Sequence, residues 1–461
     1  MTYPKYAPHQ SYDSELTAPG PPGRPLVGNL FDFSQDRMHQ FVQLRNAYGD
    51  VVRLKVGPRV LHLVSHPDLI KYVLQDNNRN YTKGRGLEKA RPLLGRGLLT
   101  SEGEFWRRQR RMIQPAFHRR RIEQFVSLML EEIESVLARW EPISLQGRSF
   151  DVATEMMRLT LSVVTRTLFS AGLSSDETQV VSQALPFLLR ETDRRIASLT
   201  SLRESLPLPV NRKYAHELER LDRIVYRLIE QRRKSPQEES DLLGMLMSAV
   251  DEGSVSGMDD QQLRDEVMTL FLAGHETTAN NLTWTFYLLS SNPAVRQALE
   301  AELEKVLAGR PPALEDVPRL VYTRQVLDES LRLYPPAWAF GRQAIQDDQI
   351  GGYHIPAGTQ LIISPYVVHR HPEFWENPEG FDPERFNPEV AQGRPHYSFI
   401  PFGGGPRLCI GRDFALMEST LALARISQRY RLDLVPGFEV QPETAITLRP
   451  KAGLRMILHA R

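Results

Sequence analysis

The run Phe402-Gly-Gly-Gly-Pro-Arg-Leu-Cys409-Ile-Gly411 contains the only cysteine in this chain of 461 residues. A lone cysteine excludes an intramolecular disulfide. It also excludes a zinc or iron–sulfur site that needs several thiolates from one chain. Three interpretations remain for Cys409: an inert thiol, a nucleophile, or a single axial ligand to a metal that something else holds. Free cysteine is most often a small buried hydrophobe, so the decision depends on the surrounding residues.

Glycines at 403–405 and 411 surround Cys409. Because glycine loses much backbone entropy on folding, this density indicates positive φ angles or a very close approach of the loop to another group. After Gly411, apolar residues recur at helical spacing, so Cys409 is expected to lie just before a helix. The free N–H groups of a helix start, together with the charge of Arg407, favour a thiolate over a thiol.

The pattern Phe402-x-x-Gly405-x-Arg407-x-Cys409-x-Gly411 resembles the haem-binding signature of the cytochrome P450 superfamily. The resemblance implies that the cysteine thiolate is the proximal ligand of haem b and pushes electron density onto the iron. A chance glycine-rich turn is the alternative. A phosphate-binding loop is a poorer one, because the run lacks the Lys-Ser/Thr ending of a P-loop and the spacing of a dinucleotide fingerprint.

The composition is that of an ordinary globular protein, with 41% hydrophobic and 25% charged residues and a net charge of +1. This balance implies no strongly charged partner such as nucleic acid. No apolar run reaches the roughly 18 residues of a membrane span, and the polar start of the chain is neither a signal peptide nor an anchor. We therefore expect a soluble, cytoplasmic protein of bacterial type, with a polar, proline-rich segment over residues 1–25 and one catalytic domain over residues 26–461.

Periodicity predicts a mainly α-helical protein with a minor β region, which matches the cytochrome P450 fold and its long central helix over the haem. Alternating residues predict a hairpin of strands at 51–56 and 60–64. Helices dominate from about residue 100 to 335, and strand-like pieces return later in the chain. The central helix is expected over about 33 residues, from Asp259 to Ser291, which is roughly 50 Å.

The middle of that helix reads Ala273-Gly-His-Glu-Thr-Thr278 and resembles the family's oxygen-activation motif. The resemblance implies that Ala273 lies at the haem and that Gly274 makes room for dioxygen. It further implies that Thr277 donates a hydrogen bond during oxygen activation and that Glu276 supplies protons through water. A carboxyl and hydroxyl relay suits a reaction that consumes two protons. From the residues alone, a polar patch on an exposed helix face is the alternative.

Arginines are expected to bind the haem propionates, because the guanidinium fork matches a carboxylate. Trp106-x-x-x-Arg110 matches the family's motif on a helix whose start, Ser101-x-x-Glu104, resembles a capping box. Arg342 and Arg407 are the other two candidates. Arginine is abundant in this chain, which weakens the case for any single position.

A buried charge triad is expected beneath the haem. Glu329-Ser-Leu-Arg332 resembles the family's Glu-x-x-Arg helix, and Pro383-Glu-Arg385-Phe resembles the segment whose arginine completes the triad. Glu329, Arg332 and Arg385 are therefore predicted to lock the core rather than to act in catalysis. His369 and His371 could indicate a second metal, but two imidazoles without a carboxylate cluster are too few for a site.

The substrate pocket is expected where segments flank the haem in the family. Its apolar character predicts an apolar substrate, such as a fatty acid, terpenoid, steroid or polyketide-like molecule. Trp338 is expected to cap the pocket. The predicted lining residues are Leu87, Phe271, Ala337, Trp338, Ala445 and Ile446.

The sequence thus predicts a haem-thiolate monooxygenase that inserts one oxygen atom of O2 into an apolar substrate by hydroxylation or epoxidation. Electrons are expected from a separate ferredoxin or flavodoxin/reductase partner. A basic face near Arg107 and Arg120 is a candidate docking patch, with a merely solvated face as the alternative. A haem-thiolate isomerase or peroxide-driven enzyme is disfavoured by Glu276-Thr277. A haem-based gas sensor is the alternative outside enzymes.

Overall fold

The computed structural model describes residues 16–25, 27–29, 36–84, 86–169, 173–198, 202–234, 241–249 and 257–461. The expected N-terminal segment therefore lies outside the described residues up to residue 15. Its described end packs on the first strand, because the Arg53 N–H donates to the Pro19 carbonyl at 2.8 Å. No helix within these ranges is both long and apolar enough to cross a lipid bilayer.

Helices make up most of the fold, which confirms the predicted class. They are α1 (Arg37–Tyr48), α2 (Pro67–Lys71), α3 (Arg91–Leu94), α4 (Gly103–Ile113), α5 (Arg119–Ile122), α6 (Val126–Leu145), α7 (Val152–Phe169), α8 (Ser175–Ala197), α9 (Leu202–Ser205), α10 (Pro209–Lys234), α11 (Leu242–Ser248), α12 (Asp260–Ser291), α13 (Pro293–Leu307), α14 (Val321–Leu333), α15 (Pro365–Val368), α16 (Pro388–Ala391) and α17 (Arg412–Arg429).

The strands form one larger sheet and several small ones. They are β1 (Val51–Val56), β2 (Arg59–Val64), β3 (Tyr81–Thr82), β4 (Ser149–Asp151), β5 (Phe340–Ala344), β6 (Asp348–Ile350), β7 (Tyr353–Ile355), β8 (Gln360–Ile363), β9 (Tyr430–Leu434), β10 (Pro442–Thr444), β11 (Leu448–Pro450) and β12 (Arg455–Ala460). The five-stranded sheet has the order β1-β2-β8-β5-β3. Its first two strands are the predicted hairpin, paired from Val51 with Val64 to Val56 with Arg59.

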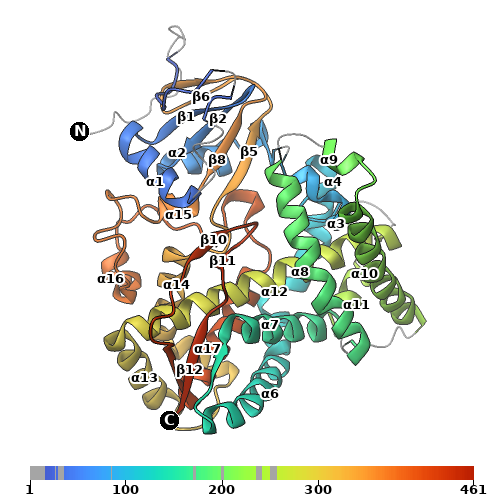
Figure 1. Ribbon diagram of the computed structural model, residues 1–461, viewed down its shortest axis with the longest axis vertical. Helices are drawn as coiled ribbons and strands as arrows, with labels where there is room; N and C mark the ends of the chain where they lie inside the picture. The colour runs from blue at the N-terminus through green and yellow to red at the C-terminus, as the bar shows by residue number, and fades with distance from the viewer. Residues whose placement is uncertain are drawn as a thin grey trace.

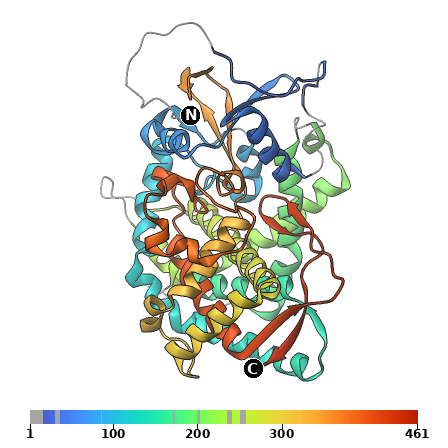
Figure 2. The same ribbon diagram turned by 90° about the vertical axis from the view of Figure 1, so that its left-hand side faces the viewer.

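The long helix α12 crosses the middle of the molecule, with the five-stranded sheet at one end (Figure 1). The C-terminal strand β12 lies at the opposite end in both views (Figure 2). Asp259 caps α12 by accepting a hydrogen bond from the Gln262 N–H at 2.8 Å. The helix is buried along most of its length among apolar side chains of α6, α7, α10 and α17. An almost fully buried central helix can therefore present side chains to a site inside the protein.

Candidate functional site

The loop that carries Cys409 is held by backbone hydrogen bonds just before α17. The Cys409 N–H donates to the Phe402 carbonyl at 3.0 Å, and the Leu408 N–H donates to the Gly405 carbonyl at 3.0 Å. Gly405 has a φ of +63°, and a Cβ there would lie 1.8 Å from the Leu74 carbonyl oxygen. Only glycine fits that position, so the glycine density reflects both positive φ and a close approach of backbone.

Cys409 is exposed in the structure, although free cysteine is usually among the most buried residues. Burial among surrounding protein atoms nevertheless raises the pKa of the thiol, while a hydrogen bond from the Gly411 N–H and the charges of Arg110 and Arg412 act in the opposite direction. The hydrogen bond from the Gly411 N–H acts in the direction expected of a helix start, but burial outweighs it. A cation bound directly to the sulfur is what stabilises a thiolate in such surroundings.

One face of α12 is accessible at its middle. Ala273 is exposed and Thr277 is half-buried, whereas most of the helix around them is buried. The Thr277 hydroxyl donates to the Ala273 carbonyl at 2.8 Å. Glu276 is 4% exposed, and its Oε1 accepts a hydrogen bond from the Thr447 hydroxyl at 2.7 Å. The Glu276 carboxylate and the Thr277 hydroxyl thus come from adjacent residues of one helix, and each makes a hydrogen bond with a different partner.

Gly274 has a packing reason for being glycine. A Cβ at this position would lie 2.9 Å from Val164 Cγ2 on α7, which is too close for real atoms. Close packing of α12 on α7 therefore requires glycine here, beside the role in making room for dioxygen that the motif implied. His275 is buried, and its Nδ1 lies 3.1 Å from the Phe271 carbonyl oxygen, so its side chain packs within the protein.

Positive side chains gather around the cysteine loop and α4. The Arg110 guanidinium donates to the Leu408 carbonyl at 2.8 Å, and the Arg407 guanidinium lies 3.6 Å from the centroid of the Trp106 ring. Burial lowers the pKa of both Arg342 and Arg407 to about 10. A lowered pKa means that each guanidinium group has lost hydration and that nearby carboxylates do not fully compensate for this loss.

Lys83 joins this positive group, and no motif in the sequence pointed to it. Its ammonium donates to the Leu98 carbonyl at 3.0 Å and to the Leu99 carbonyl. Burial lowers its pKa, and the nearby charge of Arg407 adds to that effect. Within the described part of the chain, the carboxylate that accepts hydrogen bonds from this group is that of Glu102. The donors are the Arg407 guanidinium and the backbone N–H of Lys83.

The predicted capping box at the start of α4 is wrong. Helix α4 begins at Gly103, which has a φ of +62°, and the residue before it makes no side-chain cap. The Ser101 hydroxyl has no hydrogen-bond partner among the described residues, and the Ser101 carbonyl instead accepts from Arg407 at 3.0 Å. The segment is shaped by its contacts with Lys83 and Arg407, which override the local capping preference.

The three charged residues Glu329, Arg332 and Arg385 meet in the core. Arg332 makes a bidentate pair with the Glu329 carboxylate at 2.6 and 2.7 Å, and both side chains are 0% exposed. The Arg385 Nε donates to Glu329 at 3.3 Å. Arg332 also donates to three backbone carbonyls, those of His369, Pro378 and Gly380. The group therefore ties α14 to the long segment that leads toward the cysteine loop.

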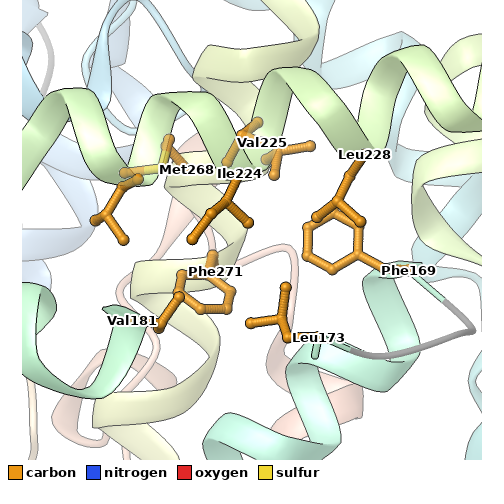
Figure 3. A pocket seen from close by; sticks show the side chains of 10 residues that line it. Phe169, Leu173, Val181, Ile224, Val225, Leu228, Met268 and Phe271 are labelled. Atoms are coloured by element: carbon orange, nitrogen blue, oxygen red, sulfur yellow. The ribbon is translucent and has the colours of Figure 1, made fainter. Parts of the chain in front are cut away.

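Two predicted pocket residues lie elsewhere. Phe271 is two residues from Ala273 and so points to the opposite side of α12, since each residue turns an α-helix by about 100°. It faces an apolar cavity of about 20 Å³ between α7, α8, α10 and α12, with Ile224 and Leu173 beside it (Figure 3). That volume holds little more than one water molecule, so the pocket role of Phe271 is a wrong prediction.

Trp338 is packed rather than presented to a pocket. It is 7% exposed, its ring centroid lies 6.1 Å from that of Phe41, and its indole N–H donates to the Ala445 carbonyl at 2.9 Å. The expectation that it caps the pocket is corrected: it anchors the backbone of the β10–β11 hairpin. Of the other predicted pocket residues, Ala337 and Ile446 are exposed, and Leu87 and Ala445 are half-buried.

The histidines at 369 and 371 make structural contacts. His369 Nε2 accepts from the Ile400 N–H at 2.9 Å, and His371 Nε2 lies 3.0 Å from an Asp50 carboxylate oxygen. No cluster of metal-binding side chains was found in the part of the chain that the structure describes. The basic residues of α4 and α5 mostly face outward: Arg107, Arg111, Arg119, Arg120 and Arg121 are exposed, and Arg108 is half-buried.

These residues fit a haem. The accessible Cys409 sulfur offers a single thiolate ligand. The half-buried positive group of Arg110, Arg342, Arg407 and Lys83 hydrogen-bonds to one carboxylate among the described residues, that of Glu102, which leaves it able to bind the two carboxylates of a haem. Taken together with the accessible turn of α12 at Ala273, this donor set defines the class of haem-thiolate proteins.

Residues 18–455 match the family model described as Cytochrome P450, and the chain belongs to the cytochrome P450 family. It is 41% identical to cyclooctatin synthase of Streptomyces melanosporofaciens, over 95% of this chain and 94% of the relative. It is 36% identical to pentalenene oxygenase of Streptomyces avermitilis, over 96% of this chain and 97% of the relative. The crystal structure of the cytochrome P450DA heme domain superposes with a TM-score of 0.88 at 30% identity, over 97% of this chain and 98% of that one.

The protein is therefore a cytochrome P450 monooxygenase, as predicted, with a haem-thiolate cofactor. It uses O2 and electrons from a redox partner to oxygenate an organic substrate. The haem, when bound, supplies the iron at which O2 is activated. The chain's own residues must hold that group, exclude bulk water from it and deliver protons.

Proposed function

We propose that this enzyme hydroxylates or epoxidises a cyclic terpenoid with a largely hydrocarbon skeleton, and that haem b is its cofactor. The names of two relatives give pentalenene and cyclooctat-9-en-7-ol as compounds they oxygenate. The observation that carries the proposal is the accessible Cys409 sulfur together with the half-buried arginine group around it. Leu87, Ala337, Ala445 and Ile446 line the substrate side in this proposal, and their side chains are apolar throughout.

The substrate class is tested by the low- to high-spin shift that follows when a ligand displaces water from the haem iron. Cyclic alkenes and alkenols such as pentalenene and cyclooctat-9-en-7-ol are expected to produce the shift at micromolar concentration. Linear fatty acids and steroids of similar hydrophobicity serve as the matched comparison. A stronger shift with fatty acids than with every cyclic alkene would overturn the terpenoid assignment without affecting the assignment to the family.

Three groups of residues carry the reaction in this proposal. Cys409 is the iron ligand, with Phe402, Gly411 and Ala273 against the cofactor. Arg110, Arg342 and Arg407 bind the propionates, with Trp106 stacked on Arg407. Glu276 and Thr277 deliver protons, and the Glu329, Arg332 and Arg385 triad supports the fold.

Thr277 is expected to govern how much of the consumed oxygen reaches the product. In Thr277→Ala, O2 and electrons continue to be consumed, but product per electron falls roughly tenfold or more, because a group that transfers protons is lost. Peroxide release measured beside product formation checks this. Thr278→Ala removes the neighbouring hydroxyl, which is buried on α12, and serves as the control. An equal fall in both variants would contradict the role given to Thr277.

The electron donor is proposed to be a separate ferredoxin or flavodoxin in the cytoplasm. The exposed arginines of α4 and α5 offer a positive surface close to the propionate-binding residues, since Arg110 lies on the same helix α4. An acidic partner docking there would be steered by charge. In this proposal residues 26–461 act as one catalytic domain.

A further inference from the structure

A hairpin far from α12 in sequence controls the surroundings of Glu276. The Thr447 hydroxyl, in the turn between β10 and β11, donates to Glu276 Oε1 at 2.7 Å and accepts from the Asn280 amide at 3.0 Å. The same Glu276 oxygen lies 3.7 Å from the Arg449 guanidinium. A hydroxyl and a cation therefore both act on the same oxygen of this carboxylate.

Arg449 joins Glu276 to two further carboxylates. Its Nε donates to Glu443 Oε2 at 2.9 Å, and Glu443 is the residue directly opposite Arg449 in the β10–β11 pairing. Asp193, on α8, is half-buried. Burial raises the pKa of Asp193, and the charges that act on it are those of Arg37, Arg449, Glu443 and Glu276. Groups from α1, α8, α12 and the hairpin therefore interact in one place.

The exposure of these side chains rises outward. The Glu276 side chain is 6% exposed, that of Arg449 is 24% exposed and that of Glu443 is 39% exposed. The series runs from the interior of α12 to the surface of the hairpin. The side chains of Arg449 and Glu443 thus connect the buried acid to the surface of the protein.

The hairpin holds Arg449 firmly. The neighbouring Leu448 donates its N–H to the Pro336 carbonyl at 2.9 Å, and its own carbonyl accepts from the Trp284 indole at 3.1 Å. The turn is fixed as well, because Trp338 donates to the Ala445 carbonyl. Since both backbone groups of Leu448 are bonded, the backbone carrying Arg449 is fixed relative to α12.

We propose that Arg449 is the positioning residue for proton supply in this enzyme. It holds the Glu276 carboxylate at the inner end of a route that enters between the β10–β11 hairpin and α8, past Glu443 and Asp193. Arginine does not release its proton in proteins, so Arg449 orients the acid and is not itself a carrier. The inference rests on the proposed role of Glu276 and Thr277 in proton delivery.

The proton balance defines what the route must carry. Oxygenation follows RH + O2 + 2 e⁻ + 2 H⁺ → ROH + H2O. O2 is reduced, the substrate is oxidised, and the redox partner supplies both electrons. In this proposal both protons enter from water beside Glu443 and Asp193, pass to the Glu276 carboxylate and leave it toward the Thr277 hydroxyl. One oxygen atom ends in the product and the other in water.

The test compares Glu276→Gln, Arg449→Gln and Glu443→Gln in the haem-loaded enzyme, with pentalenene as the probe substrate. In Arg449→Gln, product per electron is expected to fall about five- to tenfold. The pH of half-maximal product formation is expected to move upward, because a carboxylate that loses a neighbouring cation holds its proton to higher pH. The charged and titratable groups near Glu276 are Arg449, which faces it, His275 beside it on α12 and Asp193 on α8, with Glu443 paired to Arg449.

A second readout needs no turnover. The unfolding equilibrium constants of Glu276→Gln, Arg449→Gln and the double variant are measured in denaturant. The constant of the double variant is expected to differ by a factor of about five from the value obtained by multiplying the two single effects, as for side chains in contact. Glu443→Gln, at the exposed end of the route, is expected to shift the pH profile in the opposite direction by a smaller amount, because it removes a negative charge paired with Arg449. Arg431→Gln is the matched control, because Arg431 pairs with Asp433 at 3.0 Å on a different sheet.

Two results would overturn the inference. One is an unfolding constant of the double variant equal to the product of the single effects. The other is an Arg449→Gln enzyme whose product per electron and pH profile match those of Arg431→Gln while Glu276→Gln is uncoupled. If Glu276→Gln itself keeps full coupling, it is the proposed proton role of Glu276 that fails. The midpoint of the pentalenene spin shift separates a loss of substrate binding from a loss of proton supply.

Discussion

Cys409→Ser is expected to remove the strongly red-shifted Soret band of the reduced, CO-bound protein and to abolish monooxygenase activity. A serine hydroxyl does not ionise near neutral pH, so it cannot donate electron density to iron as a thiolate does. The loss of activity should exceed the roughly 10–100-fold that follows removal of an outer-shell partner of a metal ligand. The CO difference spectrum, the haem content and product formation check this.

The fold should survive this change. Serine is close to cysteine in size, and the loop depends on backbone bonds such as that from the Cys409 N–H to the Phe402 carbonyl at 3.0 Å. The chain contains one cysteine, so no other thiol can replace it. Cys409→Ala removes the side-chain donor altogether and serves as the comparison. A red-shifted band that persists in both variants would contradict the assignment of Cys409 as the ligand.

Glu329→Ala is expected to destabilise the protein by about 3–5 kcal/mol and to yield protein without bound haem. The change leaves the buried guanidinium of Arg332 and that of Arg385 without their shared carboxylate, and breaking a buried ion pair costs about this much. The three backbone carbonyls that also accept from Arg332 retain part of its hydrogen bonding. Chemical unfolding and haem content after purification measure the effect.

Two further variants separate charge from shape at this site. Glu329→Gln keeps the volume of the side chain and removes the charge, so an intermediate loss is expected. Glu230→Ala is the control, because Glu230 also pairs with a basic residue on a helix, Lys234 at 2.7 Å, but at the surface. The stability of the Glu230→Ala protein should therefore equal that of the parent protein. Recovery of stable, fully haem-loaded Glu329→Ala protein would count against the triad as the support of the core.

Motifs with fixed spacing can be interpreted from the sequence alone. The cysteine loop, the Glu-x-x-Arg helix and the acid–hydroxyl pair are local in the chain, and their contacts repeat wherever the same backbone forms. The bond from Thr277 to the Ala273 carbonyl is of this kind, since it depends only on helical geometry. The opposite direction of Phe271 follows from the same geometry, so its assignment to the substrate pocket was already at odds with the spacing.

Other predictions failed because of contacts between distant segments. The capping box at Ser101 failed because the adjacent Glu102 binds Lys83 and Arg407. The packing constraint on Gly274 also had no local signal, because it comes from Val164 on α7. Trp338 turned toward Phe41 and the β10–β11 hairpin. Local preferences of about 2 kcal/mol or less, such as a helix cap, yield to buried contacts of this kind.

The resemblance of the run around Cys409 to the haem-binding signature was enough to indicate the family, the cofactor class and the reaction class, because that signature lies within one short stretch of the chain. The partners of Glu276 could be determined only by the folded protein. Thr447 and Arg449 lie far along the chain from Glu276, on a hairpin that α12 meets only after folding. Charge and hydrogen bonding act through space, so the proton environment of the acid is a property of the tertiary structure alone.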